Sequence, residues 1–225
     1  MRTEIFPFSL GFNDCYIIRE QGVIMIDGGP PNKKMDLIKA MKEISLNPEN
    51  IKLIVITDGH PDHIGSARDI KEPTKAKIAM HRLAKDCLET GEWKKMHTPG
   101  GWIGRKMLGR VVTWFYGEIP SAEVELVVED DGLSLKEYGI SGRIVYTPGH
   151  TMGSVSVLLD SGEAFVGDLA MNKLPFRLGP GLPTVAEDSG KVKESWRKLL
   201  ELGATTVYPA HGKPFSAEVI KKALK

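Results

Sequence analysis

The strongest constraint on the fold of this chain is a short apolar run that ends in a cluster of metal-binding side chains. Residues 51–56 are mostly β-branched and apolar, with one lysine, which predicts a buried strand. Four imidazole or carboxylate groups follow within six residues: Asp58, His60, Asp62 and His63. These groups are donors that zinc, iron and manganese accept. The stretch therefore predicts a metal site at the end of a strand.

The spacing of these donors suits more than one metal ion. Asp58 and His60 are two residues apart, so in an extended loop their side chains leave on the same side. Asp62 and His63 are adjacent and point in different directions. One short loop can thus supply two neighbouring metal positions. The alternative is a polar helix start, in which Asp62 caps a helix that begins near His63.

The length and composition suit one large α/β domain, or two small ones, in a reducing compartment. The chain has 225 residues, of which 41% are hydrophobic, and its net charge of +1 gives no global case for nucleic-acid binding. Cys15 and Cys87 fit no disulfide framework. No signal peptide is evident, and no apolar run approaches the ~20 residues of a membrane span. We therefore expect a cytoplasmic protein without a membrane span.

Short apolar runs alternate with helical stripes along most of the chain. Besides residues 51–56, the pattern predicts strands at 15–18, 23–26, 76–80, 123–128, 143–146, 155–159, 164–166 and 205–208. It predicts helices at 32–44, 64–70, 81–88, 188–202 and 216–224. Residues 174–187, rich in proline and glycine, are predicted to form a surface loop. A hairpin, a helix and a donor-bearing strand recur in each half, as a similarity of pattern only.

The alternation stops at about residues 92–120. This segment holds three of the four tryptophans among lysines and arginines. We interpret it as a partly helical insert in a single domain of residues 1–225, not as a second domain. Its aromatic side chains either pack on the body of the protein or form a lid, a homodimer contact or an interfacial surface.

Further donors follow other apolar strands, beside glycine or proline. Asp58, His150, Asp168 and His211 each stand at or shortly after a strand's carboxyl end, where α/β architectures gather their ligand sites. We expect all the donors to converge in one site. The set is Asp58, His60, Asp62, His63, His150, Asp168 and His211. So many donors exceed one tetrahedral zinc and suit two metals that share a carboxylate.

At these positions the chain resembles the metallo-β-lactamase superfamily. That family carries a His-x-His-x-Asp-His loop, a Pro-Gly-His-Thr-x-Gly-Ser loop, an Asp after Gly, and a Pro-x-His-Gly loop. The corresponding motifs, with an early Ile-Asp-Gly-Gly, stand here at residues 58–63, 148–154, 167–168, 209–212 and 26–29. The resemblance runs from about residue 13 to residue 212. The ordered set is specific, whereas any one motif would not be.

The resemblance implies a four-layer αββα sandwich with two mixed β-sheets and two divalent metals, zinc in the first place, at one sheet edge. By position, the first metal is held by Asp58, His60 and His150, the second by Asp62, His63 and His211, and Asp168 bridges them. A metal-bound hydroxide is then the nucleophile, because a divalent ion lowers the pKa of water to about 7. With one metal bound, Asp62 is instead the base that orients the water.

Asp58 departs from the family motif, which has histidine at this position. A carboxylate is charged and harder than an imidazole. Direct ligation by Asp58, which we favour, shifts the site toward iron or manganese. If Asp58 only hydrogen-bonds to a ligand, the first metal keeps two histidines and the bridge, and its occupancy falls.

The resemblance leaves three classes of function. The first is a metal-dependent hydrolase of a small-molecule ester, thioester, lactone or amide, similar in layout to the glyoxalase-II-like branch. Only 13 residues follow Gly212, where that enzyme has a helical extension, which weighs against glutathione thioesters. The second is a phosphodiesterase or nuclease, although nucleic acid is an unfavoured partner. The third is a diiron redox relative.

Other conspicuous side chains receive structural interpretations. His81 and His97 match no motif position and are predicted to be surface or structural residues. Asp27 is expected to orient a neighbouring ligand, not to bind metal itself. Tyr208 and Trp196 are expected in the core.

Overall fold

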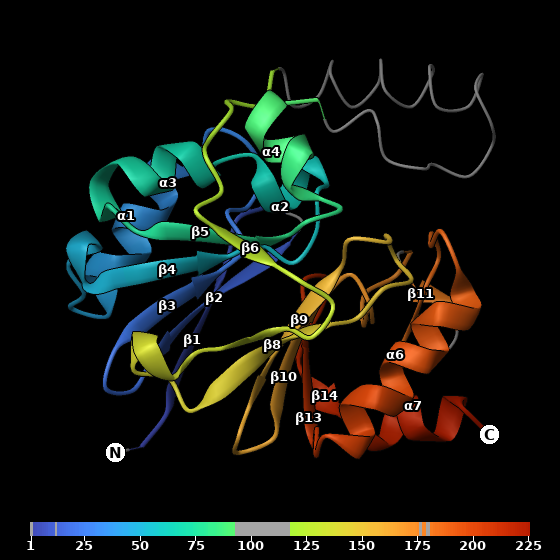
Figure 1. Ribbon diagram of the computed structural model, residues 1–225. Coiled ribbons are helices and arrows are strands. Elements are labelled where there is room, and N and C mark those ends of the chain that lie inside the picture. Colours follow the sequence, from blue (N-terminus) through green and yellow to red (C-terminus); the bar gives the residue numbers. More distant parts are fainter. Residues whose placement is uncertain (1, 12, 93–117, 176, 179–180) are drawn as a thin grey trace.

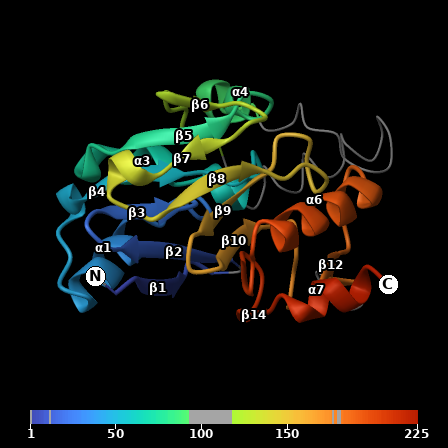
Figure 2. The ribbon, with the colours of Figure 1, turned by 60° about the horizontal axis from the view of Figure 1, so that its bottom comes forward.

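Two six-stranded sheets pack face to face, and helices cover the outer face of each (Figure 1). The computed structural model describes residues 2–11, 13–92, 118–175, 177–178 and 181–225. Figures 1 and 2 place α6 (Ser189–Glu201) and α7 (Glu218–Ala223) on the opposite side of the molecule from α1 (Lys34–Glu43) and α3 (Ala67–Thr74). The predicted αββα sandwich is confirmed.

The first sheet contains the strand that leads to the donor loop. Its strands lie in chain order: β1 (Glu4–Ser9), β2 (Asp14–Arg19), β3 (Val23–Ile26), β4 (Ile51–Val55), β5 (Lys77–His81) and β6 (Leu126–Val128). The pairs from β1 to β3 are antiparallel and those from β3 to β6 are parallel, so the sheet is mixed. Parallel neighbours need crossover connections, and α1 and α3 lie in two of them.

The second sheet repeats this plan with one parallel pair. Its order is β14 (Phe215–Ser216), β13 (Thr206–Pro209), β10 (Glu163–Gly167), β9 (Val155–Leu159), β8 (Gly142–Tyr146) and β7 (Leu133–Ser134). Only β10 and β13 run parallel, and α6 lies in the crossover between them. Each sheet thus joins an antiparallel meander to a strand that returns through a helix, which agrees with the repeat seen in the sequence.

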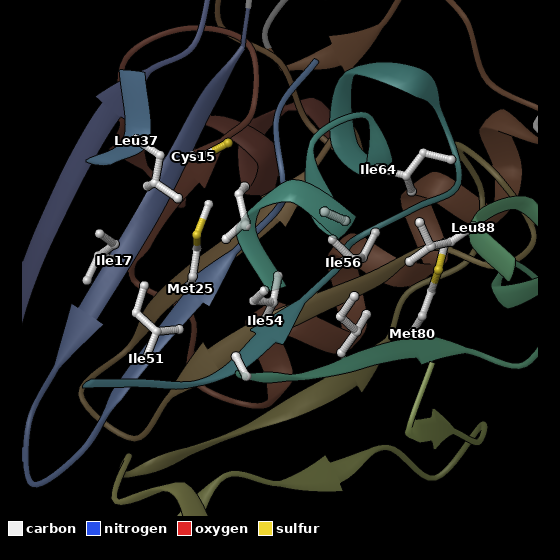
Figure 3. Packing of buried hydrophobic residues seen from close by; sticks show 14 of the residues in the cluster. Cys15, Ile17, Met25, Leu37, Ile51, Ile54, Ile56, Ile64, Met80 and Leu88 are labelled. Carbon is white, nitrogen blue, oxygen red and sulfur yellow. The ribbon is translucent and has the colours of Figure 1, made fainter. Parts of the chain in front are cut away.

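Alternating side chains build three apolar layers. On the first sheet, Ile17, Met25 and Ile54 face the covering helices (Figure 3). Their neighbours Ile18 and Ile24 face the second sheet, because successive residues of a strand point to opposite faces. A third cluster lies between the second sheet and its helices, and includes the predicted core residue Trp196, which is 1% exposed. Tyr208, also predicted in the core, is only partly buried against the central layer.

Several predicted boundaries were wrong for local reasons. The predicted helix 64–70 is two helices, α2 (Pro61–Ile64) and α3, because Gly65 and Ser66 separate them. Helix α4 (Lys85–Thr90) begins later than predicted, since β5 extends through His81. Strand β1 was missed, because its burial alternates only weakly and Pro7 interrupts it.

The predicted insert 92–120 lies mostly outside the described residues, so its role and the single-domain assignment stay predictions. The same holds for His97. Within the parts of the chain that the structure describes, no helix is long and apolar enough to cross a bilayer.

Candidate metal centre

All the predicted donors come together where strands of both sheets end. Their ligand atoms form two groups, and within each group these atoms lie within 4.8 Å of one another. The first group is Asp58, His60, His150 and Asp168. The second group is Asp62, His63, Asp168 and His211. The residues other than Asp168 divide between the groups as the family motif implies.

Asp168 is common to the two groups and directs one oxygen to each. Its Oδ2 lies 3.4 Å from His150 Nε2 in the first group. Its Oδ1 lies 3.5 Å from His63 Nε2 and 3.4 Å from His211 Nε2 in the second. The residue follows β10 through Gly167, where a Cβ would stand 2.3 Å from Thr57 Oγ1, so the close approach of the two sheets requires glycine. Asp168 is thus placed so that each of its oxygens faces a different donor group.

The carboxylate of Asp58 lies inside the first group. Asp58 is 1% exposed, and its Oδ2 is 3.6 Å from His150 Nε2. Its Oδ1 accepts a hydrogen bond from the backbone N–H of His60 at 2.9 Å. One oxygen therefore shapes the loop while the other is available to an ion. Direct ligation by Asp58 stays a prediction.

Asp62 does not cap a helix, so the helix-cap alternative was wrong. The N-cap of α2 is His60, with Pro61 in the first turn, and Asp62 lies inside the helix. Proline suits the first turn of a helix because its fixed φ angle is already helical. The N–H that it lacks would have had no partner within the helix. The one-turn helix directs Asp62 Oδ2 to within 3.3 Å of His211 Nε2.

Asp27 fixes the orientation of His63. Its Oδ2 lies 2.9 Å from His63 Nδ1, and it also accepts hydrogen bonds from the backbone N–H and hydroxyl of Thr57. Asp27 is 1% exposed and belongs to neither donor group. With the Nδ1–H donated to Asp27, His63 presents the lone pair of Nε2 to the second group. These contacts match the orienting role predicted for Asp27.

The segment before α6 holds His150 and is more than the surface loop we predicted for residues 174–187. His150 Nδ1 donates to the carbonyl of Val185 at 2.8 Å, and the backbone N–H of Glu187 donates to the carbonyl of His150 at 3.0 Å. Glu187 Oε2 accepts from the backbone N–H of Met152 at 2.8 Å. Short strands β11 (Arg177–Leu178) and β12 (Leu182–Pro183) lie within the same segment. Backbone contacts of this kind leave no signature in the sequence.

Two asparagines that sequence reasoning missed also hold the donor loops. The backbone N–H of Asn172 donates to the carbonyl of His211 at 2.8 Å. Asn13 Nδ2 donates to the carbonyl of Asp62. A single asparagine in a sequence is typical of an ordinary turn. Nothing in the sequence therefore distinguished either residue.

The unpaired atoms of the centre fit divalent metal ions. Among the described residues, four buried side-chain polar atoms have no hydrogen-bond partner, and three belong to the donor set: Asp58 Oδ2, His63 Nε2 and Asp168 Oδ1. Folded proteins rarely leave such atoms unpaired. Carboxylate oxygen and imidazole nitrogen are suitable ligands for zinc and its neighbours. The donor set therefore fits an ion at each group.

The charges of the centre favour protonated imidazoles when no metal competes. Burial opposes protonation of His60, but the carboxylates of Asp58, Asp62 and Asp168 together outweigh it and raise the pKa of His60 to about 9. His211 is buried in the same way, and Asp168 and Asp62 raise its pKa to about 9. Burial lowers the pKa of His150. Because a ligating imidazole must be neutral, metal binding has to displace protons here.

His81 lies outside the centre and has a structural role, as predicted. It is fully buried, and its ring stacks on Tyr146 with centroids 4.2 Å apart. Its Nε2 is 3.2 Å from Asp130 Oδ1. It is absent from both donor groups found among the described residues.

Comparisons of the sequence and of the structure with known proteins indicate the same family. The model of the Metallo-beta-lactamase superfamily matches residues 9–211. The Beta-lactamase-like protein 2 homolog of Caenorhabditis elegans is 28% identical over 221 residues, which are 96% of this chain but only 61% of that protein's length. The Metallo-beta-lactamase fold-containing protein ST1585 of Sulfurisphaera tokodaii is 29% identical over 92% of this chain and 74% of its own. The structure of the metallo-beta-lactamase family protein TTHA1429 from Thermus thermophilus superposes with a TM-score of 0.71 at 19% identity, covering 98% of this chain and 76% of that one.

Proposed function

The chain belongs to the metallo-beta-lactamase superfamily, and we propose that it is a metal-dependent hydrolase of an ester, thioester, lactone or amide in a small molecule. The observation that carries this proposal is the position of Asp168. Its two oxygens face two separate sets of donors, and one of these oxygens is buried without a hydrogen-bond partner among the described residues. This geometry supports a pair of ions that share one carboxylate.

The proposed assignment follows the two donor groups. The first ion would be held by Asp58, His60, His150 and Asp168, and the second by Asp62, His63, Asp168 and His211. Bound divalent ions lower the pKa of a coordinated water to about 7 and offset negative charge that develops on the substrate. The protein supplies the orientation: Asp27 fixes His63, and Val185 fixes His150.

Asp62 is the carboxylate best placed to handle the proton of an attacking water. Its side chain is 20% exposed, against 1% for Asp58 and 7% for Asp168. One of its oxygens is directed toward His211. A carboxylate that is both fixed and open to solvent can orient a water and take its proton. We assign Asp62 this catalytic role in addition to metal binding.

The proposed metal is zinc, with iron or manganese as alternatives because of Asp58. A third carboxylate in the donor set makes the first position harder than one built from imidazoles. The same feature favours the second candidate function, a non-hydrolytic diiron redox protein. A homodimer and a cytoplasmic location stay predictions.

Metal analysis joined to a substrate panel tests the proposal. The purified protein should carry up to two transition-metal ions per chain, and chelation should abolish hydrolysis of an ester, thioester, lactone or amide. Asp168→Ala should lower the content of both ions, because each loses an oxygen ligand. The matched control is Asp160→Asn, an exposed aspartate in the β9–β10 turn, which should keep both ions.

Two results would contradict this. Full metal content in Asp168→Ala would show that the assigned bridge is wrong. An iron-loaded protein that turns over none of these substrates would favour the diiron redox candidate.

A further inference from the structure

One buried atom next to the metal centre is unpaired but belongs to no metal ligand. Asn13 is 1% exposed, and its Oδ1 has no hydrogen-bond partner among the described residues. Its Nδ2 donates to the backbone carbonyl of Asp62. An amide beside a carbonyl must turn its NH₂ toward that carbonyl, so the Oδ1 is necessarily the atom that faces away. The hydrogen bond from Asn13 Nδ2 is therefore formed while Asn13 Oδ1 stays unpaired.

Asn13 and the start of β2, which directly follows it, contact two of the loops that supply the second metal group; Asp168 lies on a third. The backbone N–H of Asp14 donates to the carbonyl of Ala210 at 2.7 Å, and Tyr16 Oη donates to the carbonyl of Pro209 at 2.6 Å. Ala210 directly precedes His211. Asn13 adds the contact to the loop after β4, at Asp62. The short segment 13–16 therefore connects the two loops through hydrogen bonds to each of them.

The loop after β4 also carries Asp58 and His60 of the first group, but Asn13 contacts it at Asp62, which is a donor of the second group. Asp62, His63 and His211 belong to it alone, whereas the first group takes His150 from another loop. A shift of the Asp62 turn relative to the His211 turn would therefore spoil the second group while leaving most of the first intact.

If Asn13 had a purely structural role, its loss should have a different effect. The helical partner of the Asp62 carbonyl would be the N–H of Ser66, but that N–H donates to the carbonyl of Gly29 at 3.3 Å. Asn13 could simply satisfy a carbonyl at a helix end. In that case its loss would weaken the fold and would affect both metal positions alike. However, a side chain of similar size without polar atoms would also remove the unpaired Oδ1, which offsets the lost bond.

We propose that Asn13 is a positioning residue for the second metal position, holding the Asp62 turn against the His211 turn through its Nδ2. This rests on the proposed two-metal function. The residue is kept polar for the site and not for the stability of the fold. Loss of a contact that orients a ligand typically lowers metal affinity about 10–100-fold.

The test is a stepwise Zn²⁺ titration of the metal-free protein by calorimetry, with two variants that both lack the donor. Asn13→Leu removes both polar atoms, and Asn13→Asp keeps an acceptor of the same shape. His211→Ala identifies the second position and His60→Ala the first. Both Asn13 variants should bind Zn²⁺ about 10–100-fold more weakly at the position that His211→Ala loses, and normally at the other. The added charge in Asn13→Asp would by itself favour a cation, so a loss there is decisive.

The melting temperature of the metal-free protein separates positioning from folding. Metal-free Asn13→Leu should melt close to the wild-type temperature, since it removes one unpaired buried acceptor, Asn13 Oδ1, and leaves another, the Asp62 carbonyl, without its donor. The matched control is Ser9→Ala in the same hairpin, whose hydroxyl donates to the carbonyl of Gly11 within the turn and which should change nothing.

Several results would overturn the inference. They are equal weakening at both positions, a melting temperature far below that of the wild type or failure to fold in metal-free Asn13→Leu, wild-type affinity in Asn13→Asp, or no change in either variant. A wild-type protein that binds fewer than two ions would overturn the proposed function itself, and this inference with it.

Discussion

Asp58 is the residue at which this chain differs most sharply from its family motif. Its carboxylate is buried, and its two oxygens have different neighbours: Oδ1 accepts from the backbone of His60, while Oδ2 faces His150. A histidine here would offer two ring nitrogens in place of these two carboxylate oxygens. The substitution therefore changes both the hardness of the first metal position and the way the loop is held.

Substitutions at Asp58 should separate these two effects. Asp58→Asn keeps an oxygen that can accept from the His60 N–H but removes the charge. If Asp58 ligates directly, Asp58→Asn and Asp58→Ala should both lose the first ion and retain the second. Asp58→His should keep the first ion and raise the preference for Zn²⁺ over Mn²⁺, because a nitrogen donor replaces a hard oxygen. Metal content after competition with equal Zn²⁺ and Mn²⁺ measures this.

The control for this prediction is built into the series. Near wild-type content of the first ion in Asp58→Asn would mean that the carboxylate serves the loop and not the metal. The second position, measured in the same samples, should not respond to any of the three changes.

At the residue scale, the sequence predicts which side chains come together but not what holds them in place. The predicted donors are side chains with distinctive chemistry at the ends of apolar strands, and all of them lie in the two groups. The supports are different: Val185 and Asn172 act through backbone atoms, and Asn13 acts through one amide hydrogen. Such contacts depend on which loops become neighbours in the fold, which local sequence does not specify.

At the scale of elements, buried strands and long amphipathic helices are predictable and short edge elements are not. Strands β3, β4 and β9 are largely apolar runs, and their predicted and observed bounds nearly coincide. Strands β7 and β14 have two residues each and were not predicted. A two-residue strand exists only because a neighbouring strand is already in place, so its own residues carry too little pattern to reveal it.

Helix α6 links the core to the metal bridge through Trp196. The side chain is 1% exposed, and its Nε1 donates to the carbonyl of Leu169 at 3.0 Å. Leu169 directly follows Asp168. The position of the helix and that of the shared carboxylate are therefore joined by one hydrogen bond and by the surrounding packing.

Truncation of Trp196 should cost much of the stability of the fold. Trp196→Ala should lower the free energy of unfolding by about 3–5 kcal/mol, because a large buried side chain leaves a cavity. Trp196→Phe keeps most of the packing but leaves the Leu169 carbonyl unpaired, which costs about 1–3 kcal/mol. Urea denaturation measures both.

The neighbouring Arg197 provides the comparison. Its side chain is exposed on the same helix, so Arg197→Ala should change the unfolding free energy by no more than about 0.5 kcal/mol. Trp196 variants as stable as Arg197→Ala would show that α6 contributes little to the core.

At the scale of the whole molecule, the metal centre joins the two sheets. Asp58, His60, Asp62 and His63 come from the loop after β4 in the first sheet, while His150, Asp168 and His211 follow strands of the second. Each donor group takes residues from both sheets. An ion at either position would therefore be a cross-link between the two layers in addition to the apolar layer that they share.

Metal binding should accordingly stabilise both sheets together. Ions that bind only the folded chain raise its unfolding free energy by about 2.7 kcal/mol at a free concentration 100 times the Kd. The denaturation midpoint of the wild-type protein should rise with metal concentration, and Asp168→Asn should lose most of this dependence. Hydrogen exchange should show added protection in β4 and in β13 alike. The exposed variant Asp160→Asn should keep the full response, and protection confined to one sheet would contradict the cross-link.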